Sequence, residues 1–403
     1  MKLLVINCGS SSIKIQLINM PNYEEEVRGV VERVGKENAI INLTIDNHNH
    51  KVIMPILDHL KGLKVILEML FQGDQRVCDA GEIKGVGHRV VHGGDKLSAS
   101  MIINEDVINY LIEISDLAPL HNPAHIAGIK ACQELLPHVP QVAAFDNGYH
   151  NTLPKHVYMY PIPNKYYKDY NIRKFGFHGI AFRSITMGVQ RLLHVKVNEK
   201  KMILLMLGSG TTANAVSYGK SVEVSTGFTP LEGLMQSTRC GDVDAAVFTY
   251  LMKKENLTPL DIENIANKES GWYGMSSISN DLREIYEASQ KGDALAEVTM
   301  DALYHRIKKY IGAYAAILGG VDIIAFGGGV GENAWYLREK ICRDLKFLGI
   351  CLDEKNNRSI LGEGIITHSE SKVQVVVVKV NEEKIIAEDT YSLVHGDSEP
   401  RKI

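Results

Sequence analysis

Short apolar runs that end in turns of small residues recur along the chain and predict buried strands. Residues 3–7 run into the turn Cys-Gly-Ser-Ser-Ser at 8–12, and residues 203–207 run into Gly-Ser-Gly-Thr-Thr at 208–212. A second strand-like stretch follows each turn, at 13–17 and at 213–218, so both copies predict a β-hairpin. The repetition indicates two related domains, each of which opens with a hairpin.

Later segments alternate between strand-like and helix-like patterns, which is typical of an α/β protein. Apolar runs at 142–145 and 323–326 predict buried strands, the second of which leads into a glycine loop, and 300–318 predicts a helix. The β-branched run 372–380 predicts another strand, and Asn-Glu-Glu-Lys at 381–384 begins a final helix that should pack back onto the first domain.

The length of 403 residues exceeds what one compact core usually accommodates, so two domains are expected. We place an N-terminal domain at 1–150 plus 384–403, and a C-terminal nucleotide-binding and dimerisation domain at 151–383.

Composition narrows the class of protein. With 45% apolar and 23% charged residues the chain is typical of a globular enzyme, and a net charge of -4 argues against a nucleic-acid partner. The six cysteines are scattered without a C-x-x-C pair, which fits reduced thiols in the cytoplasm. The N-terminal apolar run is too short for a signal peptide and no segment is long enough to span a membrane, so we expect neither secretion nor a membrane anchor.

Three glycine-rich turns are candidate phosphate sites, because small residues let several backbone N–H groups point at one anion. They are the turns at 8–12 and 208–212 and the glycine run at 327–333, which lies between a predicted strand and a helix-like segment. None has the Walker or the Rossmann spacing. Taken singly, each is equally compatible with an ordinary tight turn.

Charged candidates lie among small residues. Arg89 in the segment 87–94 and Arg239 in 237–242 could bind a phosphoryl group bidentately, although a lone arginine more often forms a surface ion pair. Asp146 follows a predicted buried strand, where it could bind a metal or act as a base, or simply cap the next turn. His121 and His178 stand beside apolar residues and, as isolated residues, are more typical of buried core histidines.

Taken together, these segments resemble the acetate kinase family. The resemblance rests on eight motifs in order along the whole chain, at 7–14, 87–94, 117–123, 175–179, 227–233, 238–242, 327–333 and 381–383. It implies an α/β fold of two ribonuclease H-like domains of the sugar-kinase, Hsp70 and actin type with an interdomain cleft. It also implies a homodimer formed through the second domain.

The resemblance also implies roles for individual residues. The metal site for Mg²⁺ would use Asn7 and one of Glu382 and Glu383. The catalytic group would be Asp146, Arg239, Arg89, His178 and His121. The short acyl chain would contact Val91, Leu120, Phe177 and Pro230 beside Arg89. The nucleotide would contact Lys14, Ser10, Ser12, Gly208, Ser209, Gly210, Asp281, Arg283, Gly327, Gly328, Gly329, Gly331 and Asn333.

The activity implied is reversible, in-line transfer of a phosphoryl group from ATP to acetate or propionate, which yields an acyl phosphate. The sequence departs from the family pattern near the implied site, at Asn147, at Ile180 and Phe182, at Ser209 and in the stretch 222–226. Loss of one preorganised donor can cost about 3–4 kcal/mol in the transition state. The alternative is therefore a nucleotide-binding protein of the same fold with weak or no kinase activity.

Overall fold

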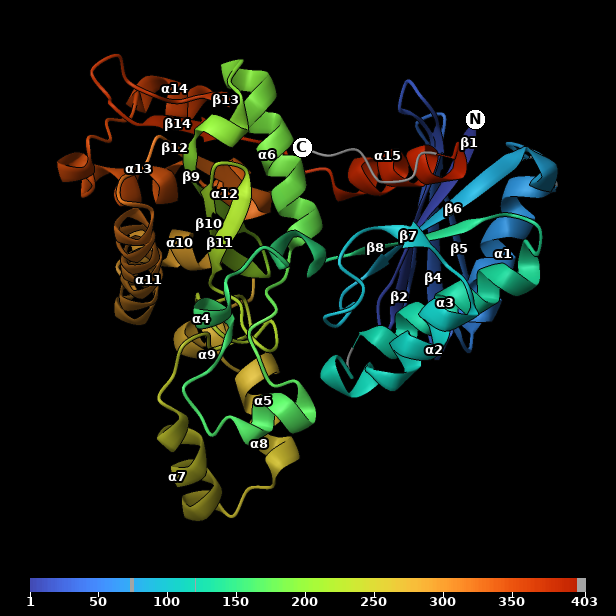
Figure 1. Cartoon of the computed structure of the whole chain (residues 1–403), viewed down its shortest axis with the longest axis horizontal. Coiled ribbons are helices and arrows are strands. Elements are labelled where there is room, and N and C mark those ends of the chain that lie inside the picture. Colours follow the sequence, from blue (N-terminus) through green and yellow to red (C-terminus); the bar gives the residue numbers. More distant parts are fainter. Residues whose placement is uncertain (73–75, 120, 397–403) are drawn as a thin grey trace. The chain divides into compact units, whose positions relative to one another are not determined.

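The computed structural model describes residues 1–72, 76–119 and 121–396, which divide into two compact units. Unit 1 combines Met1–Tyr149 with the C-terminal stretch that starts at Asn381, and unit 2 comprises His150–Val380. The sequence-based boundaries put residues 381–383 in the second domain. The contacts instead group them with unit 1, because Asn381 caps, and Glu382 and Glu383 begin, a helix that packs on the sheet of this unit. Figure 1 shows the elements of both units, each of which is described by itself.

Unit 1 is built on a mixed sheet in the order β5-β4-β3-β2-β1-β6-β8-β7. β1 and β2 form an antiparallel hairpin, whereas β6 runs parallel to β1 and β8 parallel to β6. The strands are β1 (Lys2–Cys8), β2 (Ser12–Asn19), β3 (Glu24–Glu32), β4 (Lys36–Ile45), β5 (His48–Ile56), β6 (Ile83–Val90), β7 (Met101–Ile102) and β8 (Gln141–Phe145).

The helices of unit 1 are α1 (His59–Phe71), α2 (Glu105–Glu113), α3 (Asn122–Leu135) and α15 (Glu382–Val394). α15 returns from the end of the chain and packs on β6, β1 and β8 (Figure 1), as the sequence predicts for the terminal helix. Gly87 makes this close approach possible, since an added Cβ would lie only 2.6 Å from Ile386 Cγ2.

Unit 2 repeats the plan of unit 1 with a sheet in the order β11-β10-β9-β12-β14-β13. β9 and β10 form an antiparallel hairpin, and β12 and β14 then add in parallel to β9, as β6 and β8 do to β1. Both predicted hairpins are thus confirmed. The strands are β9 (Lys201–Leu207), β10 (Thr211–Ser217), β11 (Lys220–Val224), β12 (Ile323–Gly327), β13 (Gly364–Ile365) and β14 (Gln374–Val377).

The helices of unit 2 are α4 (Lys155–Tyr158), α5 (Lys165–Tyr170), α6 (Gly179–Leu193), α7 (Ala245–Glu255), α8 (Pro259–Lys268), α9 (Gly271–Ser276), α10 (Leu282–Gln290), α11 (Ala294–Leu318), α12 (Gly328–Asn333), α13 (Trp335–Arg343) and α14 (Glu354–Ser359). Short 3-10 turns occur at Ala80–Glu82, Ser115–Leu117, Gly148–His150, Val197–Glu199 and Lys346–Leu348. None of the helices in the described parts of the chain is long and apolar enough to cross a membrane.

Three elements of unit 2 differ from their predicted extents. The strand predicted at 372–380 is shorter, at Gln374–Val377. The helix predicted at 300–318 begins at Ala294, because the Asp293 side chain accepts a hydrogen bond from the Ala296 N–H and caps an earlier turn. The glycine run is not an open loop: the chain turns at Gly328, with φ +77°, and continues at once as α12.

Candidate functional site

Five of the predicted site residues line one cavity of unit 1, of about 420 Å³. Asn7 and Lys14 face each other across the β1–β2 hairpin, Arg89 comes from β6, and Glu382 and Glu383 form the first turn of α15. These five residues therefore contribute two cations, two carboxylates and an amide to the cavity, from four elements of the fold.

Arg89 is held by Asp146, which follows the end of β8. Nη2 of the arginine donates to Oδ2 at 2.6 Å and Nε donates to Oδ1 at 3.3 Å. Asp146 is buried and Arg89 nearly so. Burial alone lowers the Arg89 pKa, but the carboxylates of Asp146 and Glu382 outweigh it and hold this pKa above its usual value. Of the two alternatives considered for Arg89 from the sequence, the structure shows the ion pair: Arg89 pairs with Asp146, in a largely buried position and not at the surface.

Glu382 carries a buried carboxylate oxygen, Oε1, that has no hydrogen-bond partner among the residues described. A buried carboxylate oxygen normally requires a donor or a cation, so this oxygen fits a metal ligand. No group of three or more His, Cys, Asp or Glu residues in the described ranges could hold a metal by itself. That suits Mg²⁺, which usually takes one or two carboxylates and fills its other positions with water and phosphate oxygens.

The remaining predicted residues of unit 1 surround the first hairpin and the start of α3. Gly9 closes the hairpin by donating its N–H to the Ser12 carbonyl at 2.8 Å, which leaves Ser10 exposed at the turn. Val91 is buried directly after β6, and His121 immediately precedes α3. Leu120 lies outside the described residues.

In unit 2, His178 lies against the second glycine turn. It adopts the left-handed conformation, with φ 61°, directly before α6, and its Nδ1 is 2.9 Å from the Thr212 hydroxyl. An added Cβ on Gly210 would lie 2.8 Å from the His178 ring, so the imidazole packs on the turn itself. The structure therefore brings the predicted catalytic histidine to the predicted phosphate turn, which a glycine at 210 makes possible.

Gln236 connects several site residues and was missed in the sequence. Its side-chain oxygen accepts from Arg239 Nη1 at 3.3 Å, and its Nε2 donates to the Pro230 carbonyl at 2.6 Å. Burial lowers the Arg239 pKa, and no carboxylate within the described ranges pairs with it. The only signal for Gln236 in the sequence was its position. It is a polar amide that follows the apolar residues 234–235 and directly precedes the motif at 237–242.

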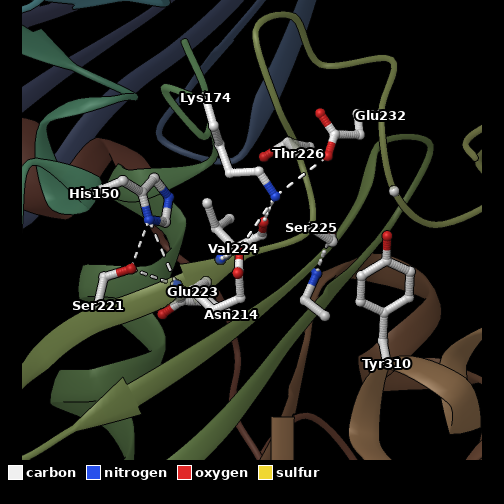
Figure 2. A network of polar contacts seen from close by, with 12 residues as sticks. His150, Lys174, Asn214, Ser221, Glu223, Val224, Ser225, Thr226, Glu232 and Tyr310 are labelled. Carbon is white, nitrogen blue, oxygen red and sulfur yellow. Dashed lines mark hydrogen bonds and ion pairs between the residues drawn. The ribbon is translucent and has the colours of Figure 1, made fainter. Parts of the chain in front are cut away.

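A polar network holds the segment 174–178 against β11 and the loop that follows it (Figure 2). Lys174 Nζ lies 3.1 Å from Glu223 and 3.2 Å from Glu232, and it donates to the Val224 carbonyl at 2.9 Å. Further along the segment, the Phe177 N–H donates to the Thr226 hydroxyl at 2.9 Å. The network thereby fixes the backbone of Phe177, which precedes His178.

The predicted nucleotide residues of unit 2 line a cavity of about 780 Å³, which lies within the usual range for small-molecule sites. Those in the lining are Gly208, Ser209, Asp281, Arg283, Gly329 and Asn333. Asp281 caps α10 and binds Arg283, whose Nη2 donates to Oδ2 at 2.6 Å.

The glycines around this cavity differ in their structural roles. An added Cβ on Gly328 would lie 2.6 Å from the Leu207 carbonyl, and one on Gly327 would lie 2.8 Å from Ile185, so these two allow close packing behind the lining. Gly331 is buried beside them. Gly329, in contrast, has open space in the direction of a Cβ and leaves room in the cavity.

Most departures from the family pattern are structural. Ile180 and Phe182 are buried in α6, and Phe182 packs edge-on against His150. Asn147 is buried as well, and its amide bonds both the Gly93 N–H at 2.9 Å and the Gly94 carbonyl at 2.8 Å. Only Ser209 of these four lines the 780 Å³ cavity of unit 2.

The predicted site residues thus form two groups, one in each unit. Unit 1 holds those from Asn7 to Asp146 and the two glutamates of α15, and unit 2 holds those from Phe177 to Asn333. Of the predicted acyl-chain contacts that are described, Val91 belongs to unit 1, and Phe177 and Pro230 belong to unit 2.

Comparisons with known proteins agree over nearly the whole chain. The model of the acetokinase family matches residues 2–388. Acetate kinase from Thermotoga maritima is 46% identical over 398 residues, which cover 98% of this chain and 99% of that protein. Acetate kinase from Thermoanaerobacterium thermosaccharolyticum is 44% identical over 398 residues, which cover 98% of this chain and 100% of that protein.

Solved structures give the same result. The crystal structure of Porphyromonas gingivalis acetate kinase matches with a TM-score of 0.94 and 41% identity, and covers 98% of this chain and 99% of its own. A propionate kinase from Francisella tularensis matches with a TM-score of 0.89 and 35% identity, over 97% of this chain and 99% of its own.

Proposed function

The chain belongs to the acetokinase family, and from that premise we propose that it transfers the γ-phosphoryl group of ATP reversibly to acetate. The observation that carries the proposal is the cavity of unit 2, because one lining combines the glycine turn at 208–209 with Asp281, Arg283 and Asn333. Propionate is the second acceptor to consider. One added methylene changes binding in an apolar pocket by only about 1–3 kcal/mol.

The proposed reaction is a direct displacement. A carboxylate oxygen of acetate forms a bond to the γ-phosphorus while the bond from that phosphorus to the β,γ-bridging oxygen breaks, and ADP leaves with the electron pair. Acetate is ionised at neutral pH, so no proton has to be removed from it. We propose that Arg89 and Arg239 bind the substrate carboxylate and the migrating phosphoryl group. His178 would donate a hydrogen bond to the oxygens of the phosphoryl group. Asp146 would hold Arg89 in place, as it does in the ion pair at 2.6 Å.

We assign Mg²⁺ to Asn7 and Glu382, with Glu383 as a weaker neighbour. The support is the buried Oε1 of Glu382, which has no partner among the described residues. Bound Mg²⁺ would neutralise charge on the phosphates during transfer. Glu382→Gln is expected to raise the Mg²⁺ concentration needed for half-maximal rate at least about tenfold, whereas Glu383→Gln changes it less. Equal effects of the two substitutions would contradict this assignment.

The activity can be tested by trapping the product. The purified protein is incubated with Mg-ATP, hydroxylamine and acetate, propionate or butyrate in turn, and acyl hydroxamate is measured. We expect product with a short acid and its loss in Arg239→Ala, because the migrating charge is then unbalanced. Absence of product with all three acids, despite saturable ATP binding, would refute the proposed activity.

We further propose a homodimer formed through unit 2. The support is α7, in which no residue is buried although Val247 and Tyr250 lie on one helical face. The neighbouring α8 adds Leu260, which is also exposed. In sedimentation experiments Tyr250→Asp is expected to shift the protein from twice its chain mass of 44.8 kDa to the monomer. The matched control Leu361→Asp, at an exposed loop position, should leave the mass unchanged.

A cytoplasmic location is part of the proposal. It is supported by the six cysteines, all of which are free thiols, as is usual where glutathione and thioredoxin keep thiols reduced.

A further inference from the structure

Two tyrosine rings stack face to face beside the nucleotide cavity of unit 2. Tyr286 comes from α10 and Tyr336 from α13, and their ring centroids are 3.5 Å apart with an interplanar angle of 3°. Trp335 meets Tyr336 edge-on at 5.9 Å, and the Arg358 guanidinium lies 4.9 Å from the Trp335 ring centroid. The pair is therefore braced by an aromatic cluster instead of lying free on the surface.

The stacked pair separates two hollows. On one side is the nucleotide cavity, and on the other is a hollow of about 420 Å³ that is lined by Met300, Tyr304 and Arg358 among others. Only Tyr286 and Tyr336 belong to both linings, whereas the Gly208–Ser209 turn belongs to the first alone. The ring pair thus closes the nucleotide cavity at a place distinct from the phosphate turn.

Tyr336 also presents a polar atom without a partner. Its hydroxyl oxygen is buried and has no hydrogen bond to any described residue. Burial raises the pKa of Tyr336 to about 12, with Tyr286 and Asp281 contributing in the same direction, so the phenol keeps its proton at neutral pH. Because this oxygen is enclosed by the protein, the part of Tyr336 that a ligand in the cavity can contact is its uncharged ring.

We propose that the Tyr286–Tyr336 pair is the base-selecting wall of the nucleotide cavity and favours a purine donor over a pyrimidine donor. The inference rests on the proposed function, since it assumes that the phosphates lie at the 208–210 turn. From there a two-ring base extends further toward the wall and offers more surface to aromatic rings than a one-ring base does.

The test compares ATP with CTP in the wild type and in variants of the wall. For Tyr336→Ala the ratio of kcat/KM for ATP to that for CTP is expected to fall roughly tenfold, the loss typical of one base–aromatic contact. The change should lie in KM, with kcat at saturation retained. Tyr336→Leu keeps the apolar volume without an aromatic face and should show the same fall in this ratio. It can therefore replace the alanine variant if that variant does not fold.

Two further variants separate the parts of the wall. Tyr336→Phe keeps the stack and removes only the enclosed hydroxyl, so the ratio should fall far less than it does in Tyr336→Leu. Tyr304→Ala removes a tyrosine that lines only the second hollow, and it should leave the ratio unchanged. A folded Tyr336→Leu variant with the wild-type ratio would overturn the proposal.

Failure of the proposed activity would be recognised separately. If the wild type turns over neither nucleotide, the proposed kinase activity is refuted, but the proposed base selectivity of the Tyr286–Tyr336 pair is still testable. In that case the dissociation constants of ATP and CTP, measured by tryptophan fluorescence, give the ratio instead. The chain has two tryptophans: Trp272 lines the cavity and Trp335 packs on the wall. Equal affinities of the wild type for ATP and CTP would overturn the proposal as well.

Discussion

Replacement of Lys174 by methionine should destabilise unit 2 far more than the loss of an ordinary surface lysine would. The Lys174 side chain is only 12% exposed, and its ammonium group is shared by Glu223, Glu232 and the Val224 carbonyl. Methionine retains the length and the apolar packing of the side chain, so the substitution removes mainly the charge. It leaves two carboxylates close to each other without the cation that links them (Figure 2).

The expected loss follows from the burial of the three side chains. Removal of one partner from a fully buried ion pair costs about 3–5 kcal/mol. Glu232 is 33% exposed and water will solvate part of its charge, so we expect a loss of about 2–3 kcal/mol in the free energy of unfolding. For a unit of this size that corresponds to a decrease in Tm of about 5–10 °C.

Tryptophan fluorescence during urea unfolding is the appropriate assay, since both tryptophans, Trp272 and Trp335, lie in unit 2. Lys2→Met is the matched control, because it removes a partly buried ion pair of unit 1, Lys2 to Glu26 at 2.6 Å. That control should leave the fluorescence transition unchanged. In a double-mutant cycle, Lys174→Met and Glu223→Gln should show a coupling of at least about 1 kcal/mol. Additive effects, or a loss below about 0.5 kcal/mol, would refute the reasoning.

Three further outcomes can be measured. Burial lowers the pKa of His88 to about 4 and that of His150 to about 3, so the unfolded chain binds protons below about pH 6.5 that the folded chain does not. Stability should therefore fall with decreasing pH by about 1.4 kcal/mol per unit for each histidine, and His88→Asn should reduce that slope in urea titrations. Gly328→Ala should impair folding, whereas Gly329→Ala should fold and raise the KM for ATP. Both ring nitrogens of His125 are buried without a partner in the described structure, so His125→Leu should raise Tm.

The hairpins and their turns could be predicted because their signals are local. An apolar run followed by small residues specifies strand and turn without reference to the rest of the chain. The meander β3 to β5 was not predicted, since its strands have one exposed face and carry many charged residues among the apolar ones. The helix at Gly328–Asn333 goes against glycine's low helix propensity, and close packing of Gly328 on β9 outweighs that propensity.

Contacts between distant residues could not be predicted from either residue alone. Arg89 and Asp146 were each identified as candidates, but their pairing across 57 positions requires β6 and β8 to be neighbours in the sheet. Lys174 and Gln236 carried no local motif, and their importance comes from the partners that the fold brings to them. The family resemblance supplied the roles of Asp281 and Arg283, which composition and spacing would not have identified.

The return of α15 to unit 1 has a consequence for synthesis on the ribosome. Residues 1–149 leave the ribosome early, but the helix that covers β6 and β1 is made among the last residues of the chain. At roughly 5–20 residues per second, the face of the nascent sheet waits on the order of 10–50 s for this cover. Unit 2 is continuous from His150 to Val380 and can be completed before then. Unit 1 can therefore finish folding only after unit 2 has been synthesised, and the apolar face of its sheet stays uncovered until then.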